Sequence, residues 1–405
     1  MSDAILRALR GILGERGTEW DGSGLPRAGP DSTDAVAHVV GLAYEQGWRI
    51  RIEGARSWMP ADVPAHLALS TRALSRVVSI LPSDLVATAQ AGVSIAVLTQ
   101  ELRDKGAWLG LDPPGRPERS MGSVVTTGTA GAFRHRFGPV RDHVLGCAVV
   151  LGDGQVVHSG GLVVKNVAGY DLTKLQIGGF GAFGVVTEVQ LRLRAEPAVE
   201  TTLVARAPRD RLTRAARELM EADLEVGALE LLSPALAQGG EWALALHFAG
   251  TAAGVAAELD RAQTTAGLTW SALLAAEQAE FWDRAARGTL GGPVTLRLGV
   301  LPDGLDPVLD LLAERLDLVL VSGGGGSGGI RWSGSTTPAA IREVRRLAAE
   351  REIPVTLERA PWPIRRAVGH FGAYREGVGH LVAGLRGTLD PRSLFQVPLE
   401  GSGEE

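Results

Sequence analysis

Residues 165–194 read KNVAGYDLTKLQIGGFGAFGVVTEVQLRLR, and the fold prediction depends on how this stretch is interpreted. It contains GFGAFG at 179–184, which spells the G-x-G-x-x-G pattern of dinucleotide-binding turns. In sites of that kind a helix begins within the glycines. Here the glycines precede VVTEVQLRLR, whose alternation of apolar and polar residues and β-branched Val and Thr are typical of a strand. We therefore predict a tight turn between a helix at 171–176 and a strand at 185–194, and no nicotinamide site of that kind.

The flanking sequence predicts further short elements. The N-terminal MSDAILRALRGILGERG has helical periodicity, and the segment Pro30 to Trp48 combines cap residues, helical spacing and a terminal glycine. Two β-rich runs around an Asp-Gly turn predict a hairpin within 146–159. A helix is also predicted for SIAVLTQELRDKG. Strand patterning occurs in WRIRIEG, LALSTRALSRVVSIL and LVATAQ, and loop residues dominate ARSWMPADVP and LGLDPPGR.

From Val199 onward, amphipathic helices alternate with strands, which predicts α+β layers. The helices are expected at 211–220, 252–262 and 338–350, and the strands in ALALHF, VTLRLGV, LDLVLV and IPVTLE. The order strand, helix, strand, strand, helix occurs at 201–266 and in comparable form at 294–358, which indicates a duplicated unit without a residue-level repeat. SGGGGSGG at 322–329 is expected to connect two strands flexibly, because it lacks the following Lys and helix of a phosphate loop.

The composition narrows the class of protein. A chain of 405 residues is expected to hold at least two cores. Apolar residues make up 45% and charged residues 21%, as in soluble globular proteins, and the formal charge of −5 argues against binding nucleic acid or anionic lipid. The single cysteine, Cys147, lies in the apolar run CAVVL and is expected to be a buried hydrophobe in a reducing compartment. We expect no secretion signal and no transmembrane segment, because Gly, Arg or Asp interrupts each apolar run before the roughly 18 to 20 residues that cross a bilayer.

Four segments together carry a resemblance to a known family. They are GSVVTTGTAG, RFGPVRDHVLG, VVLGDGQVV and GGLVVKNVAGYDLTKLQIGGFGAFGVVTEVQLRL. The combination resembles the FAD-binding domain of the vanillyl-alcohol oxidase type, also called the PCMH fold. Within that superfamily it is most similar to the FAD-binding subunits of bacterial glycolate oxidases, which carry the same KNVAGYDL signature. The resemblance covers residues 30–197 and a closing DPRSLF at 390–395.

The resemblance implies an α+β fold with three parts. Residues 1–198 are expected to form a PCMH-type FAD-binding domain of two α+β subdomains. Residues 199–385 are expected to form an α+β cap domain with an antiparallel sheet. The C-terminal segment 386–405 is expected to return toward the FAD-binding domain.

The resemblance also implies that two loops wrap the FAD. The first is EGARSW, which stands in place of a glycine-rich loop around the pyrophosphate; its matching residues are Gly54, Ala55, Arg56 and Ser57. The side chains of Ala55 and Arg56 leave less room for the cofactor at this loop than the glycines of the family pattern do. The second is MGSVVTTGTAG, whose small residues let the backbone approach the cofactor and whose hydroxyls can donate to phosphate oxygens. Its matching residues are Gly122, Ser123, Thr127, Thr129 and Gly131, and Gly128 stands where relatives have Asn.

Three further segments are implied to lie beside the cofactor. The matching residues are Gly138 and Asp142 in FGPVRDHV, Pro113 and Pro114 in the D-P-P loop near the isoalloxazine, and Gly184, Val186 and Thr187 at the strand edge that reads the adenine. For Asp142 a structural bond to a loop amide is the expected role. The signature residues Lys165, Asn166, Tyr170 and Asp171 are expected to orient the helix beneath the cofactor. No His or Cys occupies the positions where some relatives attach FAD covalently, so the FAD is expected to be non-covalent.

The residues that would oxidise a 2-hydroxy acid are not recognisable in the sequence. Such a reaction requires a base or metal for the hydroxyl proton and a cation for the carboxylate. Catalytic relatives are implied to use H-x-x-x-x-x-x-H and an H-x-G-D-G-N-x-H-like segment, and neither occurs here. Isolated histidines such as His370 and His380 are expected at the surface, and Arg365, Arg366 and Arg375 on a solvated helix. We therefore predict no metal site and assign no catalytic residue.

Three functions stay open from the sequence. The resemblance favours an FAD-binding subunit of a multi-subunit 2-hydroxy-acid (glycolate) oxidase that supports assembly or electron transfer beside a catalytic flavoprotein subunit and an iron–sulfur subunit. One cysteine cannot hold an iron–sulfur cluster alone, so electrons would leave through flavin or another chain. The alternatives are an autonomous FAD-dependent 2-hydroxy-acid oxidase and a flavin-fold scaffold without cofactor. The expected location is cytoplasmic, with attachment to the inner membrane only through partners.

Overall fold

The first sheet holds the N-terminal strands. The computed structural model describes residues 2–161, 171–316, 320–324 and 328–400 of the chain. Within them the first sheet has the order β1-β2-β4-β3, in which β1 and β2 are antiparallel and the other neighbours parallel. Its strands are β1 Thr18–Trp20, β2 Pro26–Ala28, β3 Ile50–Glu53 and β4 Leu67–Ser70, and its helices α1 Ser2–Leu13 and α2 Thr33–Gln46. Apolar residues of both helices pack on β3 and β4 and on Val150 and Val185 of the second sheet, so one core joins the two sheets.

The second sheet is antiparallel throughout, in the order β5-β6-β10-β8-β9. Its strands are β5 Val77–Leu81, β6 Val86–Gln90, β8 Val144–Val150, β9 Val156–Gly160 and β10 Val185–Arg192, and a separate pair joins β7 Ala107–Trp108 to β11 Arg194–Ala195. The helices of this part are α3 Ile95–Arg103, α4 Met121–Thr127, α5 Arg134–Phe137, α6 Val140–His143 and α7 Leu172–Gln176. Cys147 is buried among the apolar residues of this sheet, as predicted.

The glycine-rich turn has the predicted form. Helix α7 is capped by Asp171, whose carboxylate accepts from the amide of Lys174 at 3.3 Å, and strand β10 begins directly after Gly184. Phe180, Gly181 and Gly184 have φ values of 54°, 82° and 147°, which a regular helix does not contain. The prediction of a turn between a helix and a strand is therefore confirmed.

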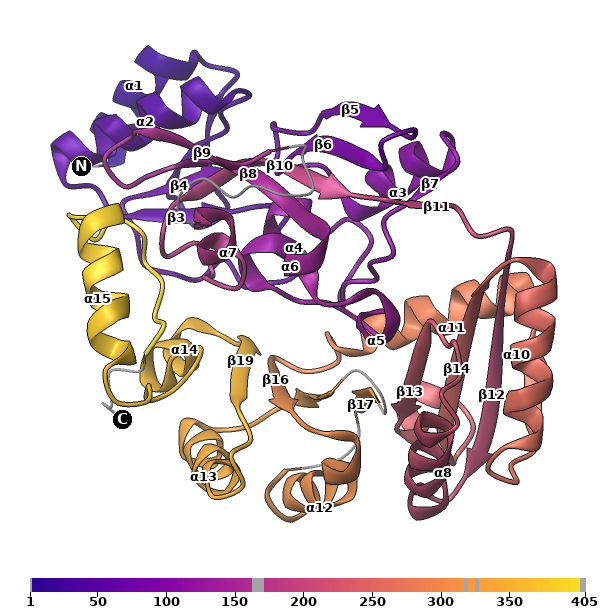
Figure 1. Cartoon of the computed structure of the whole chain (residues 1–405). Helices are drawn as coiled ribbons and strands as arrows, with labels where there is room; N and C mark the ends of the chain where they lie inside the picture. The colour runs from indigo at the N-terminus through magenta and orange to yellow at the C-terminus, as the bar shows by residue number, and fades with distance from the viewer. Residues whose placement is uncertain (1, 162–170, 317–319, 325–327, 401–405) are drawn as a thin grey trace.

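A sheet of eight antiparallel strands fills the second half of the chain, in the order β15-β12-β14-β13-β17-β18-β16-β19 (Figure 1). Its strands are β12 Val199–Ala207, β13 Ala228–Leu232, β14 Trp242–Gly250, β15 Trp270–Leu273, β16 Val294–Gly299, β17 Leu320–Gly324, β18 Gly329–Gly334 and β19 Val355–Arg359. The helices are α8 Arg209–Glu221, α9 Pro234–Ala237, α10 Ala252–Thr264, α11 Ala275–Gly288, η1 Pro302–Gly304, α12 Leu305–Arg315 and α13 Pro338–Ala349. Helices α8, α10, α12 and α13 share one large apolar core with the sheet, and α9 and α11 form a second core with it.

The predicted duplication is present in this sheet. The order β12, α8, β13, β14, α10, β15 repeats as β16, α12, β17, β18, α13, β19, with α9 and α11 as additions in the first copy. Each copy contributes four strands in mirrored order, and the copies meet where β13 pairs with β17. The glycine run does not only connect strands, because Gly323 and Gly324 belong to β17 and Gly329 to β18. Gly323, Gly324 and Gly329 are paired between β17 and β18. The expectation of a flexible connection is therefore wrong for these residues.

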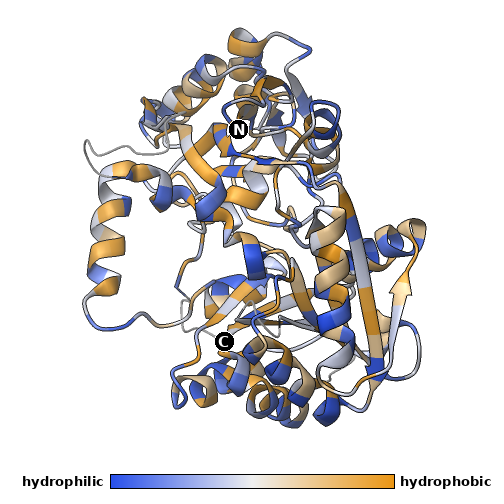
Figure 2. Cartoon of the chain, turned by 45° about the vertical axis from the view of Figure 1, so that its right-hand side comes forward, coloured by the Kyte–Doolittle hydropathy of each residue, from blue (hydrophilic) through white to orange (hydrophobic). Residues whose placement is uncertain are grey.

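The C-terminal segment returns to the first sheet. After α14 Trp362–Val368 and α15 Val378–Leu389, Phe395 forms a parallel bridge with Ile50 and is fully buried in the N-terminal core. The amide of Ile50 donates to the carbonyl of Leu394 at 2.8 Å. Figure 2 shows apolar residues along α15, which stands at the side of the molecule, and no residue of this helix is fully buried. In Figure 1 α15 lies at the left of the molecule, below the N-terminal helices α1 and α2.

Two local predictions need correction. LALSTRALSRVVSIL does not form one strand but divides into β4 and β5, which belong to different sheets and are separated by a turn at Arg72 to Leu74. MGSVVTTGTAG is not an extended wrap, because its first seven residues form α4, which begins after Ser120 as N-cap. The side chains of Met121, Val124 and Val125 are buried and hold this helix against the core despite its weak helix formers. None of the described helices is long and apolar enough to span a bilayer.

Candidate functional site

A pocket lies where four distant parts of the chain meet. It encloses about 1060 Å³ of space, part of which is open to solvent. Its wall is formed by residues 50–61, 122–127, 180–186 and 396–398, together with a few single side chains. Gly54, Gly122 and Gly184, which lie far apart in the sequence, all belong to this wall.

The three glycines bring bare backbone into the pocket. A Cβ at Gly54 would collide with the side chain of Ser120, and a Cβ at Gly122 would lie 2.8 Å from Cβ and 2.9 Å from the carbonyl oxygen of Ala91. Gly184 has a φ of 147°, and a Cβ there would collide with Val149. At each position the glycine is required because the backbone packs directly against a neighbouring segment of the chain. This close packing brings the three segments together at the pocket.

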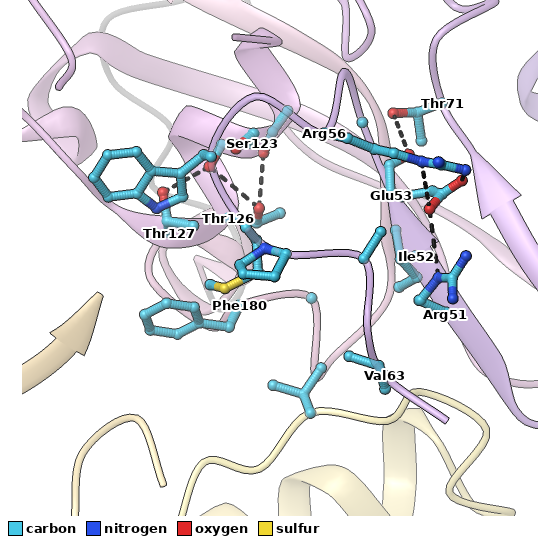
Figure 3. A pocket seen from close by; sticks show the side chains of 18 of the residues that line it. Arg51, Ile52, Glu53, Arg56, Val63, Thr71, Ser123, Thr126, Thr127 and Phe180 are labelled. Atoms are coloured by element: carbon cyan, nitrogen blue, oxygen red, sulfur yellow. Dashed lines mark hydrogen bonds and ion pairs between the residues drawn. The ribbon is translucent and has the colours of Figure 1, made fainter. Parts of the chain in front are cut away.

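The polar groups of the pocket are mostly hydrogen-bond donors. Ser123, Thr126 and Thr127 supply hydroxyls on one wall, and Figure 3 shows them together with Phe180 opposite the side chains of Arg51, Glu53 and Arg56. The Nε1–H of Trp58 and the Nε–H of Arg365 are buried in this wall and have no hydrogen-bond partner within the described residues. Buried donors without partners are rare in folded proteins and point to a ligand that accepts. The donor set and the glycine walls fit a phosphate-bearing nucleotide such as FAD.

The EGARSW loop departs from a glycine-rich loop in a specific way. Arg56 has a φ of 55°, in the left-handed region that favours glycine. Its guanidinium is turned toward the buried carboxylate of Glu53, with Nη2 to Oε1 at 2.9 Å and Nε to Oε2 at 3.0 Å. The Arg56 side chain is thus held along the wall, as Figure 3 shows, and its backbone still faces the pocket.

The C-terminal half contributes residues that the sequence did not reveal. His370 was expected at the surface, but it is fully buried and its ring stacks on Phe180 with 3.7 Å between ring centroids. Burial lowers the pKa of His370 to about 3, so the ring is neutral at neutral pH, and Nδ1 lies 2.7 Å from the carbonyl of Leu357. Arg365 was expected on a solvated helix face, but it is buried and forms an ion pair with Asp62. His380, Arg366 and Arg375 are exposed, as expected.

A second cavity lies between the N-terminal part and the eight-stranded sheet. It encloses about 1170 Å³, part of it open, and is lined by α3, the loop 112–117, residues 131–133, helix α11 and strands β13, β17 and β18. Pro113, Pro114 and Gly131 belong to this cavity and not to the first one. The aromatic rings of Phe133 and Trp282 form an apolar side of the cavity.

The polar residues of the second cavity include the acids Asp112 and Glu230 and the guanidinium of Arg331. Asp112 accepts from the amide of Phe133 at 3.0 Å, and Glu230 accepts from the Ser322 hydroxyl at 2.6 Å. Desolvation raises the pKa of each acid to about 7. Arg331 donates to Glu358 through Nε at 2.7 Å and to the carbonyl of Ala130 at 2.8 Å. Acids with a pKa near neutrality can accept and return protons at physiological pH.

Asp112, Glu230 and Arg331 were not predicted from the sequence as site residues, because no motif joins them. Asp112 stands directly before the two predicted prolines, so the D-P-P loop was the available signal for it. Glu230 and Arg331 lie on β13 and β18, within strands that otherwise alternate or are apolar. A charged residue inside a buried strand is uncommon, and that pattern could have singled them out.

Several predicted residues line neither cavity. Thr129 is buried and accepts from Arg119 at 2.6 Å, and the Thr187 hydroxyl bonds Thr33 at 3.0 Å and the carbonyl of Ala148 at 3.3 Å. The carboxylate of Asp142 lies against Gly138, where a Cβ would collide with it. The remaining predicted residues lie in the first pocket: Ala55, Arg56, Ser57, Ser123, Thr127 and Val186. Lys165, Asn166 and Tyr170 of the signature lie outside the described residues, whereas Asp171 caps α7.

Comparison with known proteins agrees with this geometry. A family model described as an FAD binding domain matches residues 27–160. Glycolate oxidase subunit GlcE of Escherichia coli is 33% identical over 175 residues, which are 43% of this chain and 50% of that protein. Glycolate oxidase subunit GlcD of Bacillus subtilis is 29% identical over 179 residues, 44% of this chain and 38% of that protein. The chain thus spans half or less of the length of these curated relatives.

Solved structures extend the likeness to the whole fold. A structure of alkyldihydroxyacetonephosphate synthase has a TM-score of 0.73 over 98% of this chain and 86% of that one, at 13% identity. The chain therefore shares the fold of that structure over nearly its whole length. Residues 27–160 are thus similar to a family described as an FAD binding domain, and the N-terminal part of the chain is similar to subunits of glycolate oxidases.

Proposed function

We propose that this chain is the FAD-binding subunit of a multi-subunit 2-hydroxy-acid oxidase of the glycolate oxidase type. The observation that carries the proposal is the pocket in which Gly54, Gly122 and Gly184 meet beside unpartnered buried donors. The similarity to GlcE, a glycolate oxidase subunit, supports the subunit role. We further propose a catalytic flavoprotein subunit and an iron–sulfur subunit as partners, and a cytoplasmic complex that reaches the inner membrane only through them.

The residues of the first pocket would hold FAD without a covalent bond. The EGARSW loop would approach the pyrophosphate, since it lines the pocket together with Ser123 and Thr127. The first N–H groups of α4 are not available for it, because those of Met121 and Gly122 donate to the carbonyls of Val93 and Ala91. Gly184 and Val186 offer the backbone of a strand edge, and the stacked rings of Phe180 and His370 close the pocket. FAD, when bound, supplies two-electron transfer. The chain's own residues orient it and exclude water.

We propose the same three-part division as the resemblance implies. Residues 1–198 would form the FAD-binding domain, since the strands of the first two sheets end at Arg192. Residues 199–385 would form the cap, since the eight-stranded sheet begins at Val199. Residues 386–405 would return to the first domain and pack on it, since Phe395 lies in its core.

An autonomous oxidase is the second candidate, and the second cavity favours it. Asp112 and Glu230 are acids that can take a hydroxyl proton near neutral pH, and Arg331 is a cation beside them. Together they would supply the base and the carboxylate partner that the histidine motifs provide in catalytic relatives. Arg331 is already paired with Glu358, however, which reduces the charge it offers to a substrate.

A purified chain separates these functions. We expect the full chain to carry FAD, visible in its absorption spectrum, and to release it on heat denaturation because the bond is non-covalent. Anaerobic addition of glycolate or D-lactate is expected to leave the flavin oxidised, and tagged chain is expected to co-purify with a second flavoprotein and an iron–sulfur protein.

Other outcomes identify the alternatives. Rapid reduction of the flavin by glycolate or D-lactate in the isolated chain establishes an autonomous oxidase. Loss of this reduction in Asp112→Asn would then assign Asp112 as the base. A chain that takes up no FAD under any condition is a scaffold. The exposed Asp283→Asn is the matched control, because Asp283 lines the same cavity but is paired with Arg287 at the surface.

A further inference from the structure

Arg119 lies at the boundary between the two cavities. Its guanidinium contacts Ser123 and Thr127, which line the first pocket, with Nε to the Ser123 hydroxyl at 3.2 Å and Nη2 to the Thr127 hydroxyl at 2.6 Å. On the other side Nη1 donates to the carbonyl of Pro114, which lines the second cavity, at 2.6 Å. The guanidinium also lies over the ring of Trp58, 4.2 Å from its centroid. Arg119 itself lines neither cavity but bonds residues in the walls of both.

The charge of Arg119 is buried without a direct counterion. Only 1% of the residue is exposed, and all of its hydrogen-bond partners among the described residues are hydroxyls or carbonyls. Burial lowers the pKa of Arg119 to about 9, so it is still a cation at neutral pH. The charge of Glu358, from a greater distance, favours the protonated form of Arg119, and the charge of Arg331 disfavours it. A buried cation held only by neutral acceptors is unusual, because buried charges are normally paired.

The neutral acceptors around Arg119 are weak substitutes for an anion. The hydroxyls of Thr127 and Thr129 both accept from the same nitrogen, Nη2, at 2.6 Å. Phosphate oxygens bind a guanidinium more strongly and in a bidentate manner. The loop that stands in place of the glycine-rich pyrophosphate loop supplies no free cation, because Arg56 is paired with Glu53.

We propose that Arg119 is the cation that contacts the pyrophosphate of the bound dinucleotide and makes the site select phosphate-bearing ligands over riboflavin. This inference rests on the proposed function, since it assumes that the first pocket holds FAD. Arg119 would exchange a threonine hydroxyl for a phosphate oxygen, which neutralises its charge. Trp58 would keep the guanidinium in place during the exchange.

The test is calorimetric titration of the full chain with FAD, ADP and riboflavin. We expect Arg119→Met to weaken binding of FAD and ADP by about 10- to 100-fold, as for loss of a charge-assisted hydrogen bond, and to change riboflavin binding less than twofold. Arg119→Lys keeps the charge and is expected to recover part of the affinity. The salt dependence of FAD binding is expected to flatten in Arg119→Met. Arg192→Met, at an exposed residue of β10 that lines neither cavity, is the matched control and is expected to bind like the wild type.

Each other outcome overturns the inference in a recognisable way. If Arg119→Met folds with an unchanged unfolding temperature and binds FAD and ADP like the wild type, Arg119 has no role toward the phosphates. Equal losses for riboflavin and FAD would show a merely structural role. If Arg119→Met does not fold, Arg119→Lys decides, because full loss of selectivity with the charge retained contradicts the proposal. A wild-type chain that binds no FAD refutes the proposed function itself, and this inference with it.

Discussion

At pH 8 the Asp112→Asn and Glu230→Gln variants are expected to be more stable than the wild-type chain, each by about 2 to 4 kcal/mol, since one pKa unit corresponds to about 1.4 kcal/mol. The reason is that desolvation raises the pKa of both acids to about 7 in the folded chain. Asparagine and glutamine keep the shape and the hydrogen bonds to Phe133 and Ser322 without a charge. The variants therefore remove an unfavourable ionisation.

The size of the stabilisation changes with pH in a defined window. Between about pH 4 and pH 7 the folded chain keeps protons that the unfolded chain has released, so the free energy of unfolding falls as the pH rises. The increase in the free energy of unfolding that either variant brings is expected to be close to zero at pH 4 and to reach its full value above pH 7.5. The Asp112 carboxylate contributes to the raised pKa of Glu230, so the double variant is expected to gain less than the sum.

Thermal unfolding between pH 4 and pH 9 measures this difference. Asp283→Asn is the control, since its carboxylate is exposed and pairs with Arg287, and its curve should follow the wild type. Variants that lose stability at pH 8 would show that Arg331 stabilises the ionised acids, and the proton-accepting role in the second cavity would be withdrawn.

Replacement of Phe395 by alanine is expected to lower the free energy of unfolding of the N-terminal core by about 3 to 5 kcal/mol. Phe395 is fully buried, bridges Ile50 and belongs to the same apolar cluster as α1, α2, β3 and β4. Removal of the ring leaves a cavity between the segments of Phe395 and Ile50, which are some 340 residues apart in the sequence. Residues 396–398 line the first pocket, so FAD affinity should fall together with stability.

Denaturant unfolding, with hydrogen exchange of β3 as a local probe, tests the Phe395 variant. Leu381→Ala is the matched control, because Leu381 on the neighbouring helix α15 is 66% exposed and its truncation is expected to change stability by less than about 0.5 kcal/mol. A Phe395→Ala chain as stable as the control would mean that the C-terminal segment does not support the FAD-binding part.

Local features of the fold were accessible from the sequence. The alternation at 185–194 identifies a strand after GFGAFG, because side chains of a strand point to opposite faces in turn. The order of elements in the second half revealed the duplication although the residues do not repeat. The start of α4 was missed because Ser, Thr and Gly are weak helix formers, and only the buried Met121, Val124 and Val125 explain why a helix forms there.

Long-range features of the site were not accessible from the sequence. His370 and Arg365 reach the first pocket from more than 170 residues after Phe180, and no spacing rule predicts such contacts. Asp112, Glu230 and Arg331 come from three segments that only the packing of the sheet against the N-terminal part brings together. The glycines could be found only through the family resemblance, because the atoms that exclude a Cβ at Gly54, Gly122 and Gly184 come from distant segments of the chain.

The pairing of β13 with β17 bears on how such a chain could have originated. Either half of the sheet alone would leave one of these strands as an open edge, which a second copy of the same half could cover in a symmetric pair. Joined in one chain, the two halves can differ in sequence. In the register of the sheet, Glu230 pairs with Ala245 where the second copy pairs Ser322 with Arg331. The guanidinium thus occurs in one copy only, an asymmetry that a homodimer of identical chains could not have had.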